Sequence, residues 1–98
     1  MSSSQITIVC FIKAKANTKQ IVEQKLKYLA EMSCKEKGNI NYILHVADND
    51  ETMFIIYENW ENQAALDNHM TQPYLAEFLS KADELLEYPI EEKICKVL

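Results

Sequence analysis

The sequence predicts an α+β domain in which a four-stranded antiparallel sheet carries helices on one face. Segments in which every second residue is apolar alternate along the chain with segments in which apolar residues recur at helical spacing. The 98 residues, 48% hydrophobic and 26% charged, have the composition of one compact domain. No repeat or linker divides the chain, so a single domain is expected over 1–98, with residues 1–4 flexible.

The chain begins with a predicted strand and a predicted helix. Residues 6–14 are rich in β-branched and aromatic types, and both faces of this strand are apolar. A helix over about 18–36 is predicted by spaced apolar residues and by a capping-box pattern that runs from Asn17 to Gln20. Gly38, the only glycine, stands where the end of this helix needs a left-handed residue.

The rest of the chain predicts a hairpin, two helices and a closing strand. Their expected ranges are 40–46 and 52–60 for the hairpin, about 63–71 for a short helix, a longer helix after Pro73, and 90–97 for the last strand. Asn62 is expected to cap the short helix.

This order, βαββααβ, is typical of a ferredoxin-like fold. The helices suffice to cover only one face of a four-stranded sheet, whereas the first strand is apolar on both faces. The economical cover for the other face is the sheet of a second, identical subunit. The sequence therefore predicts a homodimer with a barrel-like centre, a dimeric α+β barrel.

Charge and cysteine content exclude several partners. The net charge is −5, and all ten basic residues are lysines, so neither nucleic acid nor an anionic membrane surface is an expected partner. The amino-terminal residues lack the basic and apolar regions of a secretory signal, which points to the cytoplasm. Three cysteines without short spacing predict neither a disulfide framework nor a metal site.

Motifs spread over nearly the whole chain resemble the antibiotic biosynthesis monooxygenase family. They are Glu36-Lys37-Gly38, the stretch from Phe54 to Trp60, the stretch from Ala65 to His69, and Pro73. The resemblance implies a dimeric α+β barrel and, in many members, oxygenation of phenols or quinols without metal or flavin, so no cofactor is expected. The family commonly has a second histidine after the proline, where this chain has Tyr74. Among the residues that haem-degrading relatives combine, only the tryptophan has a counterpart here.

A cofactor-free oxygenase must bind an electron-rich aromatic substrate, remove a proton, and keep water from the anion that meets dioxygen. This requires few polar groups in an apolar pocket. The candidate proton acceptors are His69, His45 and Glu58. Candidate substrate-binding residues are the aromatic, apolar and amide side chains Trp60, Tyr42, Tyr57, Asn41, Phe54, Leu66 and Phe78. Each also has a structural interpretation, as a packed or hydrogen-bonded core residue.

Three function classes follow. The first is a monooxygenase that acts on a small aromatic quinol or phenol with dioxygen. The second is an isomerase or other proton-transfer enzyme that acts on a phosphorylated metabolite. In a chain without arginine, the phosphate would have to be bound by lysine cations or backbone N–H groups. The third is a dimer that binds a small ligand without catalysis.

Overall fold

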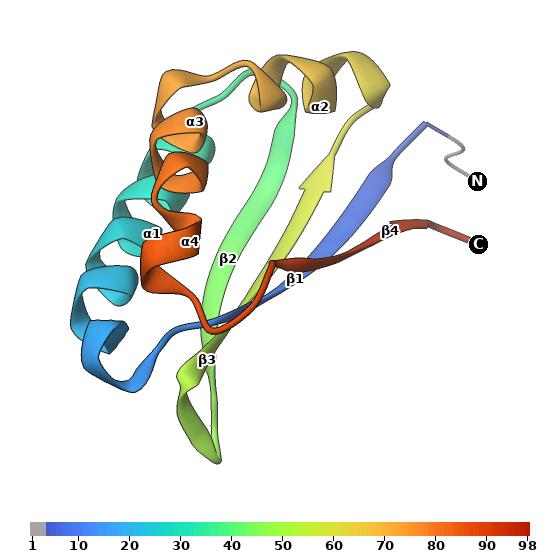
Figure 1. Ribbon diagram of the computed structural model, residues 1–98. Coiled ribbons are helices and arrows are strands. Elements are labelled where there is room, and N and C mark those ends of the chain that lie inside the picture. Colours follow the sequence, from blue (N-terminus) through green and yellow to red (C-terminus); the bar gives the residue numbers. More distant parts are fainter. Residues whose placement is uncertain (1–3) are drawn as a thin grey trace.

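The computed structural model describes residues 4–98 (Figure 1). In chain order the elements are β1 (Ile6–Lys13), the 3₁₀ turn η1 (Ala16–Thr18), α1 (Lys19–Ser33), β2 (Asn39–Ala47), β3 (Asp50–Trp60), α2 (Gln63–Met70), α3 (Pro73–Ser80), α4 (Ala82–Leu85) and β4 (Glu91–Lys96). The flexibility expected at the amino terminus falls mainly on residues 1–3, which lie outside the described residues.

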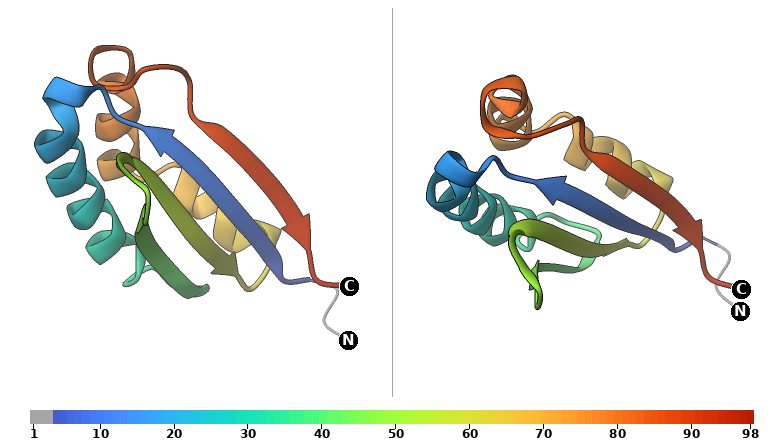
Figure 2. Two further views of the ribbon diagram at one scale, coloured as in Figure 1. Left: turned by 90° about the horizontal axis from the view of Figure 1, so that it is seen from below. Right: turned by 60° about the horizontal axis from the view of Figure 1, so that its bottom comes forward.

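The four strands form one sheet in the order β2-β3-β1-β4, and all neighbouring strands are antiparallel. Figure 2 shows the helices on one face of this sheet, with the opposite face uncovered in the single chain. The predicted α+β, ferredoxin-like architecture is confirmed. Among residues 4–98, every helix is too short or too polar to cross a membrane.

The strand registers decide which side chains meet the helices. Ile8 of β1 pairs with Glu58 of β3 and with Ile94 of β4, and Glu58 in turn pairs with Tyr42 of β2. Because side chains alternate between faces, the even-numbered residues of β1 and β4, of β2 from Tyr42 to Val46, and of β3 from Phe54 to Trp60 share the helix-facing side. These residues are buried in β1 from Ile8 to Ile12 and in β3 from Phe54 to Trp60, whereas Val9 and its odd-numbered neighbours point away from the helices.

The start of α1 differs from the predicted capping box. The helix begins at Lys19 after the 3₁₀ turn, and no side chain caps it. The Thr18 hydroxyl instead donates to the backbone oxygen of Leu85 over 2.6 Å. This long-range bond ties the start of α1 to the end of α4, so the local cap is lost to a tertiary contact.

The end of α1 also differs from the prediction. The helix stops at Ser33, and a chain of turns leads from there to β2. Gly38 does have a left-handed φ of +88°, but it lies at the entry to β2 and not directly after the helix. Its carbonyl accepts the Glu61 N–H over 2.9 Å, and a Cβ at Gly38 would stand 2.5 Å from the Ala65 Cβ. The glycine is therefore required by both backbone conformation and close approach.

The single long helix predicted after Pro73 is divided into α3 and α4. At Lys81, with φ −101° and ψ −2°, the backbone N–H bonds to the carbonyl of Phe78, three residues back, over 3.0 Å. Beyond α4 the chain turns to the sheet, where Glu87 N–H bonds to the Lys13 carbonyl over 2.9 Å. The break lets the chain return to the edge where β4 pairs with β1.

Candidate functional site

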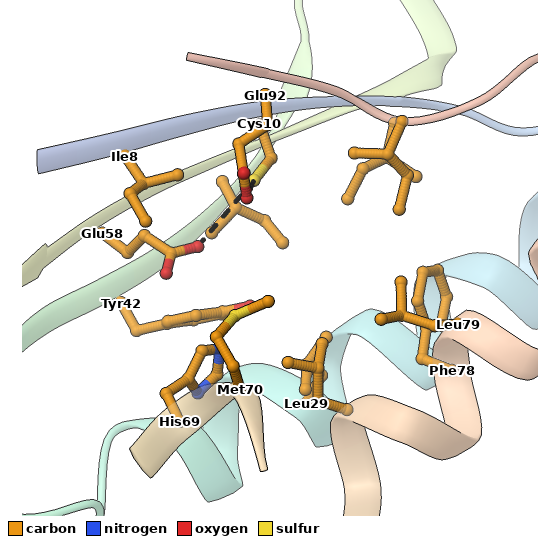
Figure 3. A pocket seen from close by; sticks show the side chains of 14 residues that line it. Ile8, Cys10, Leu29, Tyr42, Glu58, His69, Met70, Phe78, Leu79 and Glu92 are labelled. Atoms are coloured by element: carbon orange, nitrogen blue, oxygen red, sulfur yellow. Dashed lines mark hydrogen bonds between the residues drawn. The ribbon is translucent and has the colours of Figure 1, made fainter. Parts of the chain in front are cut away.

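A cavity of about 190 Å³ lies between the helix-facing side of the sheet and helices α2 and α3 (Figure 3). Most of its wall is apolar. It is lined by Ile8, Cys10, Ile12, Leu29, Tyr42, Ile56, Glu58, His69, Met70, Leu75, Phe78, Leu79, Ile90 and Glu92. Met70 and Leu79 are about half exposed, so this side of the cavity meets solvent.

Two carboxyl groups flank a buried thiol on the sheet side of the cavity. The Cys10 sulfur lies 3.9 Å from Oε2 of Glu58 and 3.8 Å from Oε2 of Glu92. The other oxygen of Glu58, Oε1, accepts the indole N–H of Trp60 over 2.8 Å. The registers produce this cluster, because Cys10 pairs with Glu92 across β1 and β4 while Glu58 and Trp60 share one face of β3.

The electrostatics of the cluster favour protonated groups. The pKa of Glu58 is raised to about 7, mainly because burial disfavours the charged form; the Trp60 N–H opposes this rise and Glu92 adds to it. Burial, followed by repulsion from Glu58 and Glu92, raises the pKa of Cys10. The sulfur is therefore a thiol near neutral pH, whereas Glu58 can exchange a proton there.

His69 stands on the opposite wall of the cavity, on α2. Its Nδ1 lies 2.9 Å from Oε2 of Glu36, and its ring packs against two aromatic rings. The ring centroids are 4.5 Å apart for Trp60 and His69 and 5.7 Å apart for Tyr42 and His69. In Figure 3 the Tyr42 ring lies between Glu58 and His69, so the phenol separates the carboxyl group on the sheet from the imidazole on α2.

The two tyrosines near His69 keep their protons. Burial is the largest cause that raises the pKa of Tyr42, with Glu58 as the next. Burial also raises the pKa of Tyr74, and the hydrogen bond that its hydroxyl donates to Glu36 adds to the rise. Both hydroxyls are hydrogen-bond donors near neutral pH.

The structure brings four of the ten residues predicted from the sequence to the cavity wall: His69, Glu58, Tyr42 and Phe78. Three others lie behind the wall in the buried core: Trp60, Phe54 and Leu66. Of these, Trp60 acts on the site indirectly, through its hydrogen bond to Glu58 and its packing on His69.

The other three predicted residues, Asn41, His45 and Tyr57, lie on the face of the sheet away from the helices. His45 is exposed, and its Nδ1 lies 3.3 Å from the Ile55 carbonyl. The Asn41 side chain accepts the amide of buried Asn59 over 3.0 Å. Neither the imidazole of His45 nor the hydroxyl of Tyr57 shares the cavity with His69.

Sequence reasoning missed three polar residues of this region. Cys10 is not a candidate from the sequence, although its place between Ile8 and Ile12 puts it on one strand face with them. Glu92 lies in the predicted last strand but is not a candidate from the sequence, and Glu36 serves there only as part of a motif. No local pattern indicates Glu36, because its partners His69 and Tyr74 lie more than thirty residues away. Within residues 4–98, no three His, Cys, Asp or Glu side chains are placed to hold a metal ion.

Comparison with known proteins adds the following. Residues 5–81 match the antibiotic biosynthesis monooxygenase family. An uncharacterized protein of Synechocystis sp. is 35% identical over 92 residues, which are 94% of this chain but 63% of that protein, so the chain spans less than two thirds of this relative. The Bacillus subtilis protein named "Putative monooxygenase YcnE" is 28% identical over 86 residues, 88% of this chain and 90% of that protein. The crystal structure of PA3566 from Pseudomonas aeruginosa has a TM-score of 0.92 at 26% identity and covers 100% of this chain and 98% of that chain.

Proposed function

The chain belongs to the antibiotic biosynthesis monooxygenase family, and we propose that it is a cofactor-independent monooxygenase that oxidises a small aromatic quinol or phenol with dioxygen. The observation that carries this proposal is the placement of a carboxyl group, Glu58, and an imidazole, His69, on opposite walls of one apolar cavity. Such a cavity can bind an aromatic ring, accept its hydroxyl proton, and limit the access of water to the anion.

The size of the cavity favours a single-ring substrate. Its volume is about 190 Å³, and an apolar protein cavity of about 150 Å³ is known to hold benzene. One substituted ring therefore fits, whereas a fused polycyclic phenol would have to extend past the half-exposed side chains of Met70 and Leu79.

The proposed reaction balances without an external reductant. His69 accepts the hydroxyl proton, and the resulting phenolate supplies electrons to dioxygen. Over the whole reaction the phenol loses its hydroxyl hydrogen and one ring hydrogen. One oxygen atom becomes a quinone carbonyl, and the other leaves as water with both hydrogens. Glu58, with a pKa of about 7, is placed to bind or relay a proton on the sheet side.

The charges at the cavity argue against the isomerase alternative. The residues that line the cavity include two glutamates and no lysine. A phosphorylated metabolite would bring negative charge to this wall without a cation to offset it. The non-catalytic binding dimer remains the alternative to be separated by experiment.

Oxygen consumption by chelator-treated, flavin-free protein tests the proposal against a panel of one-ring and fused-ring quinols and phenols. We expect uptake above the spontaneous rate with one-ring substrates, unchanged by the chelator. His69→Asn should lower turnover by about 10²- to 10⁴-fold, the usual range for a general base. Asp67→Asn, on the exposed side of the same helix, is the matched control.

Three outcomes would contradict parts of the proposal. If turnover is lost on chelation, a metal is required. If His45→Asn abolishes turnover while His69→Asn does not, the proton acceptor lies on the other face of the sheet. If no substrate gives oxygen uptake, yet a ligand raises the melting temperature, the chain is a binding protein, or an isomerase where that ligand is a sugar phosphate.

A further inference from the structure

Glu36 is a buried carboxyl group that joins three separate segments of the chain. It lies in the turns between α1 and β2, and its side chain is 6% exposed. Its Oε2 lies 2.9 Å from Nδ1 of His69, on α2, and accepts the hydroxyl of Tyr74, at the start of α3. Its Oε1 is buried and has no hydrogen-bond partner within residues 4–98. One oxygen therefore makes both contacts.

This arrangement determines which nitrogen of His69 carries the proton. A neutral imidazole has one N–H and one nitrogen with a lone pair. As a carboxylate, Glu36 can only accept hydrogen bonds, so its Oε2 presents lone pairs to the imidazole as well as to the Tyr74 hydroxyl. Nδ1 must therefore be the N–H, and the lone pair must be on Nε2.

The second nitrogen is left without a partner in the described part of the chain. Nε2 of His69 makes no hydrogen bond to any residue in the described part of the chain, and the imidazole is part of the cavity wall. The Trp60 ring, 4.5 Å away between centroids at an interplanar angle of 34°, restricts rotation of the imidazole. Rotation would in addition break the bond to Glu36.

We propose that Glu36 is a positioning residue that holds His69 in the Nδ1–H tautomer and thereby leaves Nε2 as the proton acceptor of the cavity. The catalytic part of this inference rests on the proposed function; the tautomer does not. When Nε2 takes a proton from the substrate, the imidazolium gains a charged partner 2.9 Å away. The Tyr74 hydroxyl, which keeps its proton, donates to the same oxygen and fixes the carboxyl group.

Nitrogen-15 NMR of the wild-type protein at mildly alkaline pH tests the tautomer without any assay of activity. His69→Asn identifies the His69 signals, because the chain has only one other histidine. We expect a protonated Nδ1 and an unprotonated Nε2 in His69. A protonated Nε2, whether alone or together with Nδ1, overturns the inference.

The catalytic consequence is tested with Glu36→Gln, and with Glu31→Gln on the exposed part of α1 as the matched control. Glutamine keeps the size of the side chain but removes the charge beside the imidazolium. We expect kcat for the quinol to fall by about 10- to 100-fold, by analogy with the carboxylates that orient metal-bound histidines, with little change in KM. An equal rise in KM with unchanged kcat, or no change in either, overturns the positioning role.

Tyr74→Phe provides a second variant if Glu36→Gln fails to fold. It removes one of the two donors to Oε2, so we expect a smaller fall in kcat and the same His69 tautomer. Unchanged kcat together with a changed tautomer overturns the inference. If the wild type consumes no oxygen but has the Nδ1–H tautomer, the proposed function fails while the placement of the histidine stands.

Discussion

Glu58 is the residue whose environment changes its acid–base behaviour in the most testable way. Its side chain is buried, and its pKa is raised from an ordinary 4.5 to about 7, chiefly by burial. The folded protein therefore binds this proton more tightly than the unfolded chain does. The stabilising contribution is complete below 4.5 and is lost as the pH rises through about 7. At 1.36 kcal/mol per pKa unit, the difference is roughly 3 kcal/mol.

Glu58→Gln should consequently stabilise the protein at alkaline pH. Glutamine carries no charge to bury and retains an oxygen for the Trp60 N–H. We expect the melting temperature of the variant, relative to wild type, to increase as the pH is raised from acid to above 7, and exposed Glu61→Gln is the matched control. If the difference in melting temperature between variant and wild type is constant with pH, Glu58 does not titrate in this range.

Gly38 combines two constraints that a double-mutant cycle can separate. The backbone φ at this position is +88°, which L side chains rarely adopt. A Cβ added there would stand 2.5 Å from the Ala65 Cβ. We expect Gly38→Ala to lower the free energy of unfolding by roughly 1–3 kcal/mol. Ala65→Gly in the same chain should recover the part due to the contact, because it removes the opposing methyl group.

Urea unfolding of the two single variants and the double variant measures this coupling. Exposed Ala64→Gly, on the same helix, controls for the cost of a glycine in α2. If the effects of Gly38→Ala and Ala65→Gly simply add, the contact with Ala65 is not what requires a glycine at this position.

At the scale of single elements, the predictions succeeded where the decisive interactions are local. The cap predicted at Asn62 is present, with its side-chain oxygen accepting the Ala65 N–H over 2.9 Å. The cap predicted at Asn17 is absent: Asn17 lies inside the 3₁₀ turn, and Thr18 at the N-cap uses its hydroxyl to bond to Leu85, far along the chain. Both segments carry good capping residues, so only the tertiary contact distinguishes them.

The site could be predicted only in part for a related reason. Strand alternation alone places Trp60 and Glu58 on one face and puts Tyr42 and His45 on opposite faces, and the registers agree. It could not say which group meets the helices, since both faces of the first strand are apolar. Glu36 could not be found at all, because its role depends on contacts made across the fold.

The cap at Asn62 gives a prediction for α2 as a unit, because this helix carries His69. Asn62→Ala removes the acceptor for the Ala65 N–H and should cost about 0.5–2 kcal/mol of stability. Hydrogen exchange of the α2 amides should accelerate more than exchange of the α1 amides. Asn68→Ala, exposed on the same helix, is the control. Uniform acceleration in all elements would show that α2 does not open independently of the rest of the domain.

For the whole molecule, the uncovered face of the sheet needs an explanation (Figure 2). Apolar side chains from three neighbouring strands share this face: Val9, Phe11, Ile43, Ile55 and Tyr57. Ile43 and Tyr57 remain 45% and 41% exposed in the single chain. A contiguous apolar surface of this kind is typical of an interface. His45 lies on the same face, so an interface here would bury it.

We propose that a second copy of the chain covers this face, as the two apolar faces of the first strand predict. Light scattering after size exclusion should give twice the 11.4 kDa of one chain at micromolar concentration. Ile43→Glu should yield a folded monomer, because this side chain is already 45% exposed and a glutamate there harms only the interface. Ile21→Glu, equally exposed at 49% but on α1 in the helix layer, should remain a dimer. A wild-type mass of one chain would contradict the proposal, and dissociation by Ile21→Glu in place of Ile43→Glu would move the interface to the helices.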